Sequence, residues 1–189
     1  MMELNRTTQS GNTAENIAGR DINIKTYNFE AIKVSYDKLS QLFAKIEEER
    51  KSNAPLNQFI EELERFTKPK SGVVKTLEQK LTEGEMQSFI EYALDAKETY
   101  SKFLMKHQFL KSAQEINVYL LALVRTYFNH QIYPVIQSGA DQAAIGNLIV
   151  KNIVEPILAQ LKEDTLGFTA EHIDGMLYFL TGNCYLEWK

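Results

Sequence analysis

Cysteine is almost absent from this sequence: Cys184 is the only one among 189 residues. A lone cysteine rules out an internal disulfide framework and suits a reducing compartment, so we expect a cytoplasmic protein. Long apolar runs are missing as well. The longest, residues 118–124, is far shorter than the roughly 20 residues of a membrane-spanning helix. No charged-then-apolar signal peptide opens the chain, so we expect a soluble protein without membrane association.

Histidine is scarce, and the three present, His107, His130 and His172, are far apart in the sequence. None has a histidine at i+4 or a cysteine pair nearby, whereas zinc sites use three or four ligands at recognisable spacing. We therefore expect no metal and no cofactor, and we expect each histidine to cap a helix end or to lie partly exposed. A nucleophile–base pair of Cys184 with His172 would also need an oxyanion donor, so an ordinary buried thiol is favoured.

Phosphate-binding glycine motifs are absent too, since neither GxxxxGK[ST] nor a GxGxxG after a strand occurs. The residues at 61, 62 and 64 are glutamates with Arg65 beside them, which is typical of an exposed helix face. Nucleic-acid binding calls for a basic stripe. The nearest candidate consists of Lys68, Lys70, Lys75 and Lys80, and its positive charge is offset by Glu78 and Glu83. Nothing in the sequence supports enzymatic activity, and we predict none.

What is present is the composition of a globular domain, with 44% hydrophobic and 24% charged residues. A chain of this length can bury a core without disulfides or metals. From residue 112 to the end there are 8 acidic and only 4 basic residues. This charge-poor half, rich in Leu, Ile, Phe and Tyr, is predicted to be the buried part of the fold.

Residues 1–28 differ from the rest and are predicted to be a polar segment containing one short strand. Residues 21–25, Asp-Ile-Asn-Ile-Lys, alternate polar and apolar side chains as a half-buried strand does. A single strand cannot satisfy its own backbone donors, and no second convincing strand follows. Pairing with another chain is therefore one prediction, and packing across its own domain is the alternative.

Helical periodicity begins at Phe29 and continues to the end, which predicts an all-α domain over residues 29–189. Ile32, Tyr36, Leu39 and Phe43 form the first apolar stripe. We predict an irregular bundle of about seven helices. Pro134 with Ser138-Gly139 is expected to break one helix and Pro156 to kink or split another. The predicted helices cover residues 29–51, 55–66, 73–81, 84–107, 113–132, 140–162 and 169–180, with Thr169 as the N-cap of the last.

Two stretches resemble a known family. Residues 9–13 (Gln-Ser-Gly-Asn-Thr) and 16–22 (Asn-Ile-Ala-Gly-Arg-Asp-Ile) are similar to the segment that precedes the C-terminal domains of ABC-three-component system proteins. Residues 172–184, with Trp188 close behind, resemble the closing helix and tail of those domains. The two matches stand in the expected order at the two ends of the chain.

The resemblance implies a role in bacterial conflict systems, among them Lamassu-type defences against phage and plasmids. In such systems an SMC- or ABC-like ATPase, a small middle component and an effector act together. About 28 residues precede the helical part, too few for an effector domain. We therefore expect either a stand-alone version that acts as the small component or a piece of a system whose effector is another polypeptide. The resemblance supplies no catalytic residue.

The first functional hypothesis is a docking and oligomerisation component that links an effector to the ATPase, with a homo-oligomer expected. The second is a DNA-sensing accessory subunit, with DNA contacted directly through the lysine cluster or only through partners. Alternate side chains of a paired strand and exposed aromatic residues provide specificity in protein interfaces. The residues predicted to contact partners are Ile17, Arg20, Asp21, Ile22, Ile24, Tyr185 and Trp188. For Tyr178 and Phe179 we expect burial in the core, and for Trp188 core and interface are equally plausible.

Overall fold

Helices make up nearly all the regular structure in the part of the chain that the computed structural model describes, namely residues 31–52, 58–70, 72 and 74–189, with side chains from Lys38 onward. No strand occurs in these ranges. The predicted strand at residues 21–25 lies outside the described residues. Within them, Ala31–Lys189 forms one compact unit.

Seven continuous helices run through the described residues, which confirms the predicted all-α class and helix number. Four of them contain a single α-helix, and three are joined from shorter pieces. The single helices are α1 Ala31–Ser52, α2 Glu61–Thr67, α3 Leu77–Glu83 and α9 Ala170–Gly182. The first joined helix consists of the 3₁₀ turn η1 Gln87–Phe89 and α4 Ile90–Lys106. The other two each contain a π-helical turn: α5 Lys111–Tyr127, η2 Phe128–Ile132 and α6 Tyr133–Gln137 form one, and α7 Gln142–Ile149, η3 Val150–Val154 and α8 Glu155–Leu158 form the other.

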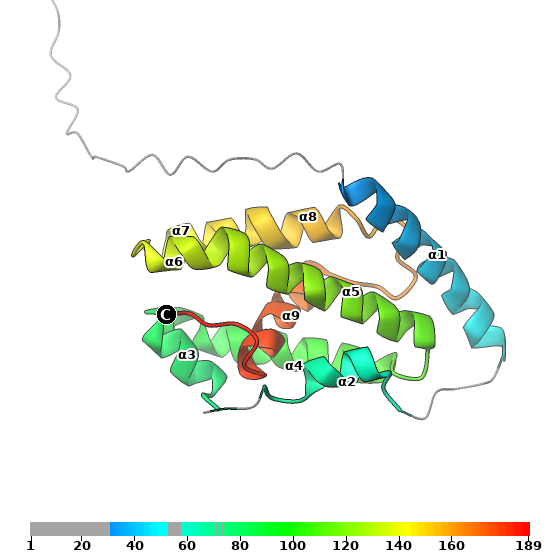
Figure 1. The fold of residues 1–189 in the computed structure, drawn as a ribbon, viewed down its shortest axis with the longest axis horizontal. Coiled ribbons are helices and arrows are strands. Elements are labelled where there is room, and N and C mark those ends of the chain that lie inside the picture. Colours follow the sequence, from blue (N-terminus) through cyan, green and yellow to red (C-terminus); the bar gives the residue numbers. More distant parts are fainter. Residues whose placement is uncertain (1–30, 53–57, 71, 73) are drawn as a thin grey trace, which may run out of the picture. The chain divides into compact units, whose positions relative to one another are not determined.

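Helix α5 occupies the middle of the bundle. It contacts α1, α2 and α9, and the largest helix–helix contact is between α4 and α9 (Figure 1). Its buried side chains come from every turn between Ser112 and Tyr127. Tyr178 and Phe179 lie in the core, as expected. None of the described helices combines the length and the apolar character that crossing a bilayer requires.

Gly175 explains how closely α9 approaches α4. A Cβ atom at this position would lie 2.3 Å from the carbonyl oxygen of Ala96 and 2.5 Å from the Cβ atom of Tyr100. Glycine in a helix interior costs stability relative to alanine. Here it is required because the α4 backbone passes where the side chain would be. Ala93 and Ala96, both fully buried, provide the matching small surface on α4.

The prediction that Pro134 breaks its helix is wrong. The helix continues from α5 through η2 to Gln137, and it ends only before Ser138 and Gly139, where φ of Gly139 is 76°. A proline inside an α-helix lacks an N–H group and collides with the carbonyl of residue i−4. Here a π-helical turn precedes the proline, with the Tyr133 N–H bonded to the Phe128 carbonyl five residues back.

Pro156 is accommodated in the same way, so the helix is modified rather than divided. The Glu155 N–H bonds to the Val150 carbonyl, again five residues back, and the chain stays helical to Leu158. Both prolines therefore lie two residues after the end of a π-helical turn, where the widened backbone removes the steric conflict.

Helix ends are fixed by side chains. Thr169 accepts a hydrogen bond from the His172 N–H, and His172 Nδ1 accepts from the Thr169 N–H at 3.0 Å, so the predicted N-cap is confirmed as a reciprocal capping box. A second N-terminus is capped from another helix. The Glu49 carboxylate of α1 accepts from the Ser112 N–H at 3.1 Å and from its hydroxyl at 2.7 Å, at the first turn of α5.

Candidate partner-binding surface

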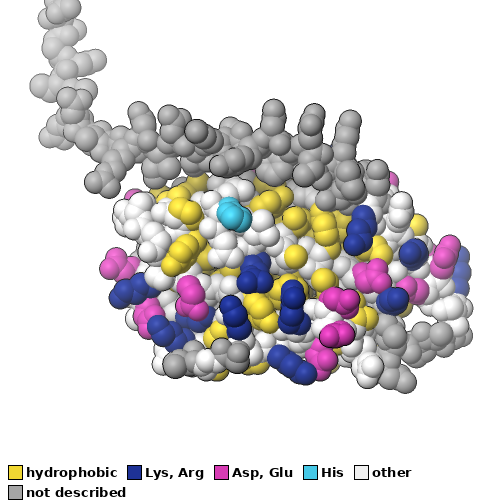
Figure 2. All heavy atoms as spheres, viewed as in Figure 1, with side chains coloured by type: hydrophobic (Ala, Val, Ile, Leu, Met, Phe, Trp, Pro, Cys, Tyr) yellow, Lys and Arg dark blue, Asp and Glu magenta, His cyan; other side chains and the backbone are white. Residues whose placement is uncertain are grey.

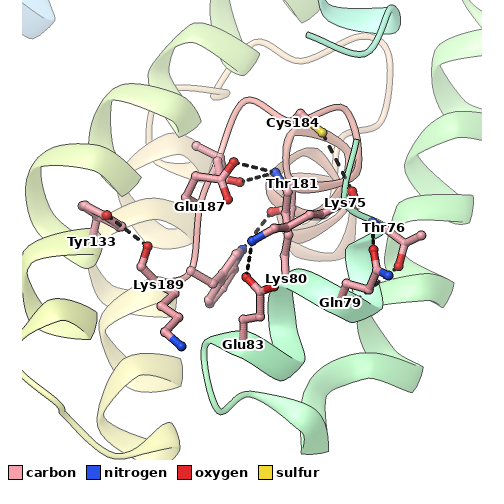
Figure 3. A network of polar contacts seen from close by, with 12 residues as sticks. Lys75, Thr76, Gln79, Lys80, Glu83, Tyr133, Thr181, Cys184, Glu187 and Lys189 are labelled. Atoms are coloured by element: carbon pink, nitrogen blue, oxygen red, sulfur yellow. Dashed lines mark hydrogen bonds and ion pairs between the residues drawn. The ribbon is translucent and has the colours of Figure 1, made fainter. Parts of the chain in front are cut away.

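The C-terminal tail, residues 183–189, begins where α9 ends. Cys184 has φ of 61°, the left-handed conformation that usually favours glycine. The Cys184 N–H bonds to the Thr181 carbonyl and the Tyr185 N–H to the Leu180 carbonyl. These two bonds form a Schellman motif, which terminates the helix and directs the chain back over the bundle (Figure 3).

Trp188 lies inside the core, with an exposed fraction of 1%. Its indole Nε1 donates to Thr181 Oγ1 at 3.1 Å. The ring centroid lies 5.0 Å from that of Phe128 and stacks on Tyr178 at 6.4 Å. Of the two readings that the sequence left open for Trp188, the structure shows the core position. Its contribution to a surface is therefore indirect, through the position it gives the tail.

Lys80 is the second anchor of the tail and the most buried charged side chain among the described residues, with 1% exposure. Its ammonium group donates to the Leu186 carbonyl at 2.9 Å and to the Glu187 carboxylate at 3.0 Å (Figure 3). A buried ammonium needs such partners, because leaving it unpaired costs several kcal/mol, of the order of 3–5. The tail is thus held by a charge from α3 as well as by an aromatic core.

Of the two predicted contact residues that the structure describes, Tyr185 is half-exposed and Trp188 is buried. The Tyr185 hydroxyl donates to the Arg65 carbonyl, and the Tyr185 ring lies 5.3 Å from the ring of Phe66 at an interplanar angle of 55°. Two guanidinium groups flank this pair of rings. The Arg125 Cζ atom lies 5.4 Å from the Tyr185 centroid, and the Arg65 Cζ atom lies 5.1 Å from the Phe66 centroid. These four residues are called the arginine–aromatic cluster below.

The charges around the arginine–aromatic cluster are unevenly distributed. On the face shown in Figure 2, Lys and Arg side chains gather over the region of α5 and the C-terminal tail, with hydrophobic side chains between them and acidic ones to either side. Within the described residues, no carboxylate lies within ion-pair distance of Arg65 or Arg125. Arg50, by contrast, pairs with Glu47 at 2.8 Å. Sequence reasoning missed Arg125, although it is the single charge in the apolar stretch 118–128.

The four lysines noted in the sequence do not form one surface. Lys80 is buried under the tail, Lys75 pairs with Glu83 at 2.6 Å, and Lys68 pairs with Glu64 at 2.6 Å. Lys70 is exposed. The glutamates of α2 lie on its outer side, as expected, with Glu61 and Glu62 exposed.

Cys184 and His172 lie at opposite ends of α9. At 1.5 Å per residue, the helix separates them by roughly 18 Å, so they do not form a pair. Cys184 is half-buried, and its Sγ atom lies 3.8 Å from the Lys75 carbonyl oxygen. Across the described ranges, no group of three or more metal-ligating side chains comes together.

The histidines occupy the positions expected of them. His107 is the C-cap residue of α4, His172 belongs to the capping box of α9, and His130 is exposed. The ring centroids of His107 and His172 lie 4.5 and 4.2 Å from that of Phe103. Burial among these rings lowers the pKa of both histidines below 6.5.

A carboxyl–phenol pair lies between α4 and α9. The Tyr92 hydroxyl donates to the Asp174 carboxylate at 2.6 Å. Burial raises the pKa of Asp174 above its usual 3.8, and burial together with this carboxylate raises the pKa of Tyr92. The pair joins the two helices and lies apart from the tail.

Comparison with known proteins gives one match. A family model described as CTD9, C-terminal domain 9 of the ABC-three component (ABC-3C) systems, matches residues 76–188, more than half of the chain. The match begins at the N-cap of α3 and includes the tail through Trp188. No curated protein and no solved structure matches.

Proposed function

Because this chain belongs to the C-terminal domain 9 family of ABC-three-component systems, we propose that it is a non-catalytic docking and oligomerisation component of such a system. It links an effector protein to an SMC- or ABC-like ATPase in a Lamassu-type defence against phage or plasmids. The observation that carries the proposal is the surface at the end of the matched region. There, a tail fixed by Trp188 and Lys80 places Tyr185 under Arg125 and beside Phe66, which lies under Arg65. Neither arginine has a carboxylate partner among the described residues.

The N-terminal segment supports the oligomerisation part of the proposal. Residues 21–25 have the alternation of a strand, and the described residues offer no strand with which they could pair. A strand at residues 21–25 would therefore find a pairing edge on another chain, unless the segment packs across its own domain. The same segment in a second copy is the simplest source.

Co-purification tests the docking role. The full-length chain is co-expressed with an SMC- or ABC-like ATPase and an effector of the same system, and the complex is measured by size-exclusion chromatography with light scattering. We expect a stable complex and a homo-oligomeric mass for the chain alone. Deletion of residues 1–28 should reduce that mass to the monomer. Failure to co-purify with either neighbour contradicts the docking role, and an unchanged mass after deletion contradicts the oligomerisation role.

A DNA-sensing role is the alternative, and the lysines give it little support, because Lys80 is buried and Lys75 and Lys68 are paired with glutamates. Titration of the full-length chain with duplex DNA at increasing salt distinguishes the two functions. Direct DNA sensing requires affinity that falls steeply with salt concentration. We expect no measurable binding at low salt.

A further inference from the structure

We propose that the arginine–aromatic cluster of Arg65, Phe66, Tyr185 and Arg125 is the docking site for an acidic protein segment, in which two carboxylates bind the two guanidinium groups. The inference deepens the proposed function and rests on it in one respect, namely that the segment belongs to another component of the system. It specifies the chemistry of the partner at this surface.

The geometry of the cluster leaves both guanidinium groups able to bind carboxylates. Each guanidinium lies over a ring, with Arg65 at 5.1 Å from the Phe66 centroid and Arg125 at 5.4 Å from the Tyr185 centroid. The ring face attracts the cation but accepts no conventional hydrogen bond in the guanidinium plane, so the N–H groups are left for a ligand. Those N–H groups form the planar fork that carboxylates bind in a bidentate manner.

The support beneath the arginines is held by burial and by hydrogen bonds. Phe66 is buried with 1% exposure, and the Tyr185 hydroxyl donates to the Arg65 backbone. The Asn183 side chain donates to the Phe66 carbonyl at 2.9 Å, and Asn183 in turn accepts from the Lys70 N–H at 3.1 Å. Because these bonds fix the rings, binding loses little conformational entropy at this surface.

The surroundings favour a short acidic peptide over a nucleic acid. Glu61, Glu62 and Glu64 lie on the same helix as Arg65, and Glu187 on the tail is exposed. These carboxylates interrupt the positive charge around the cluster, whereas nucleic-acid sites present a continuous basic stripe. A short segment that places a carboxylate at each guanidinium meets less of this negative charge than a continuous phosphate backbone would.

The test uses the full-length protein and a fluorescein-labelled peptide of alternating Glu and Gly, with fluorescence anisotropy as the readout. The same peptide with Gln in place of Glu and a single-stranded oligonucleotide of equal charge serve as comparison probes. We expect the Glu peptide to bind, the Gln peptide not to bind, and the oligonucleotide to bind more weakly. Addition of the Glu peptide should also shift the Nε–Hε NMR signals of Arg65 and Arg125.

The double variant Arg65→Gln/Arg125→Gln should weaken binding of the Glu peptide by at least about tenfold. Arg50→Gln is the matched control and should leave binding unchanged, because Arg50 is already paired with Glu47. Equal loss in the control, an unaffected double variant or tighter binding of the oligonucleotide would overturn the inference. Since this titration contains no other system component, its failure is distinct from a failure to co-purify with the ATPase.

Discussion

Gly84 and Trp188 touch so closely that a Cβ atom on Gly84 would lie 2.6 Å from both the Cβ atom and the carbonyl oxygen of Trp188. Gly84 is the C-cap residue of α3, and Trp188 belongs to the tail. These two residues, 104 positions apart in the sequence, can be in contact because Gly84 has no side chain. The tail can occupy its place in the core only while residue 84 has no Cβ atom.

Gly84→Ala should therefore destabilise the fold by about 1–3 kcal/mol, the usual cost of overpacking a core. The backbone oxygen of Trp188 cannot move away as a flexible side chain would. Urea denaturation measures the loss. Thr82→Ala, an exposed change on the same helix, is the control and should alter the midpoint little. Equal midpoints for Gly84→Ala and the parent protein would contradict the packing described.

Lys80→Met should release the tail. The substitution keeps the length of the side chain but leaves the buried Leu186 carbonyl without its donor, at a cost of about 1–3 kcal/mol. Trp188 is the only tryptophan, so its fluorescence reports on the tail alone. We expect a red shift of the emission and a lower denaturation midpoint.

Lys68→Met is the matched control for this experiment. Lys68 forms an exposed pair with Glu64, and such pairs contribute at most about 1 kcal/mol. The emission maximum of Trp188 in the Lys68→Met variant should equal that in the parent protein. A red shift of the same size in both variants would show that the effect does not come from the anchor at Lys80.

Glu49→Ala should weaken the start of α5, because the Glu49 carboxylate is the acceptor for the Ser112 N–H and hydroxyl. Loss of a helix cap costs about 0.5–2 kcal/mol. Glu48→Ala, an exposed change one residue earlier, is expected to be nearly neutral. Hydrogen exchange of the first turn of α5 should accelerate only in the Glu49 variant, and protection that stays equal in both variants would argue against the cap.

Acid should destabilise the protein through two histidines. The pKa values of His107 and His172 are lowered below 6.5 in the folded state by burial, so the unfolded chain takes up protons first as the pH falls. Stability is therefore complete above about pH 7 and decreases from about pH 6.5 downward. Protonation of His172 at Nδ1 would also remove the acceptor for the Thr169 N–H.

Denaturation midpoints between about pH 5 and pH 8 measure this dependence. His172→Gln keeps a capping-box acceptor but cannot be protonated, so its midpoint should vary less with pH. His130→Gln, an exposed change, should follow the parent curve. Measurements below about pH 5 are avoided because the raised pKa of Asp174 increases the stability of the folded state as the pH falls, which opposes the effect of the histidines. A parent midpoint that does not change across the range would contradict the prediction.

Local patterns account for the parts of the fold that were predicted correctly. The apolar periodicity predicted the helices, and Thr169 predicted the start of the last one, because caps depend on residues within one turn. The continuation through Pro134 was not predictable in this way, since a proline alone indicates a break. Neither was the cap on α5, because its acceptor is Glu49, 63 positions away.

The candidate surface was predicted only in part, for the same reason. Tyr185 was identified from its aromatic character, but its neighbours Arg65 and Arg125 come from helices 120 and 60 positions away. No periodicity connects residues at such distances. The single charge of Arg125 within an apolar stretch was the signal available in the sequence. The predicted contacts at Ile17, Arg20, Asp21, Ile22 and Ile24 lie outside the described residues and stay predictions.

The two π-helical turns have a consequence for the side chains along their helices. In a regular α-helix, residues four apart drift by about 40° around the axis at each step, so a stripe of such residues soon leaves one face. Two stripes here keep strict steps of four and stay at 0–4% exposure throughout. They are Ile116, Leu120, Val124, Phe128 and Ile132, and Ile145, Ile149, Ile153 and Ile157.

Each stripe runs into a π-helical turn, η2 or η3, where more residues per turn rotate the side chains back. The π-helical turn thus returns the following side chains to the buried face of the helix, and it also makes room for the proline. Removing a single residue from 128–132 or 150–154 would rotate every later side chain of that helix away from its place. The packing therefore constrains the number of residues in these two segments.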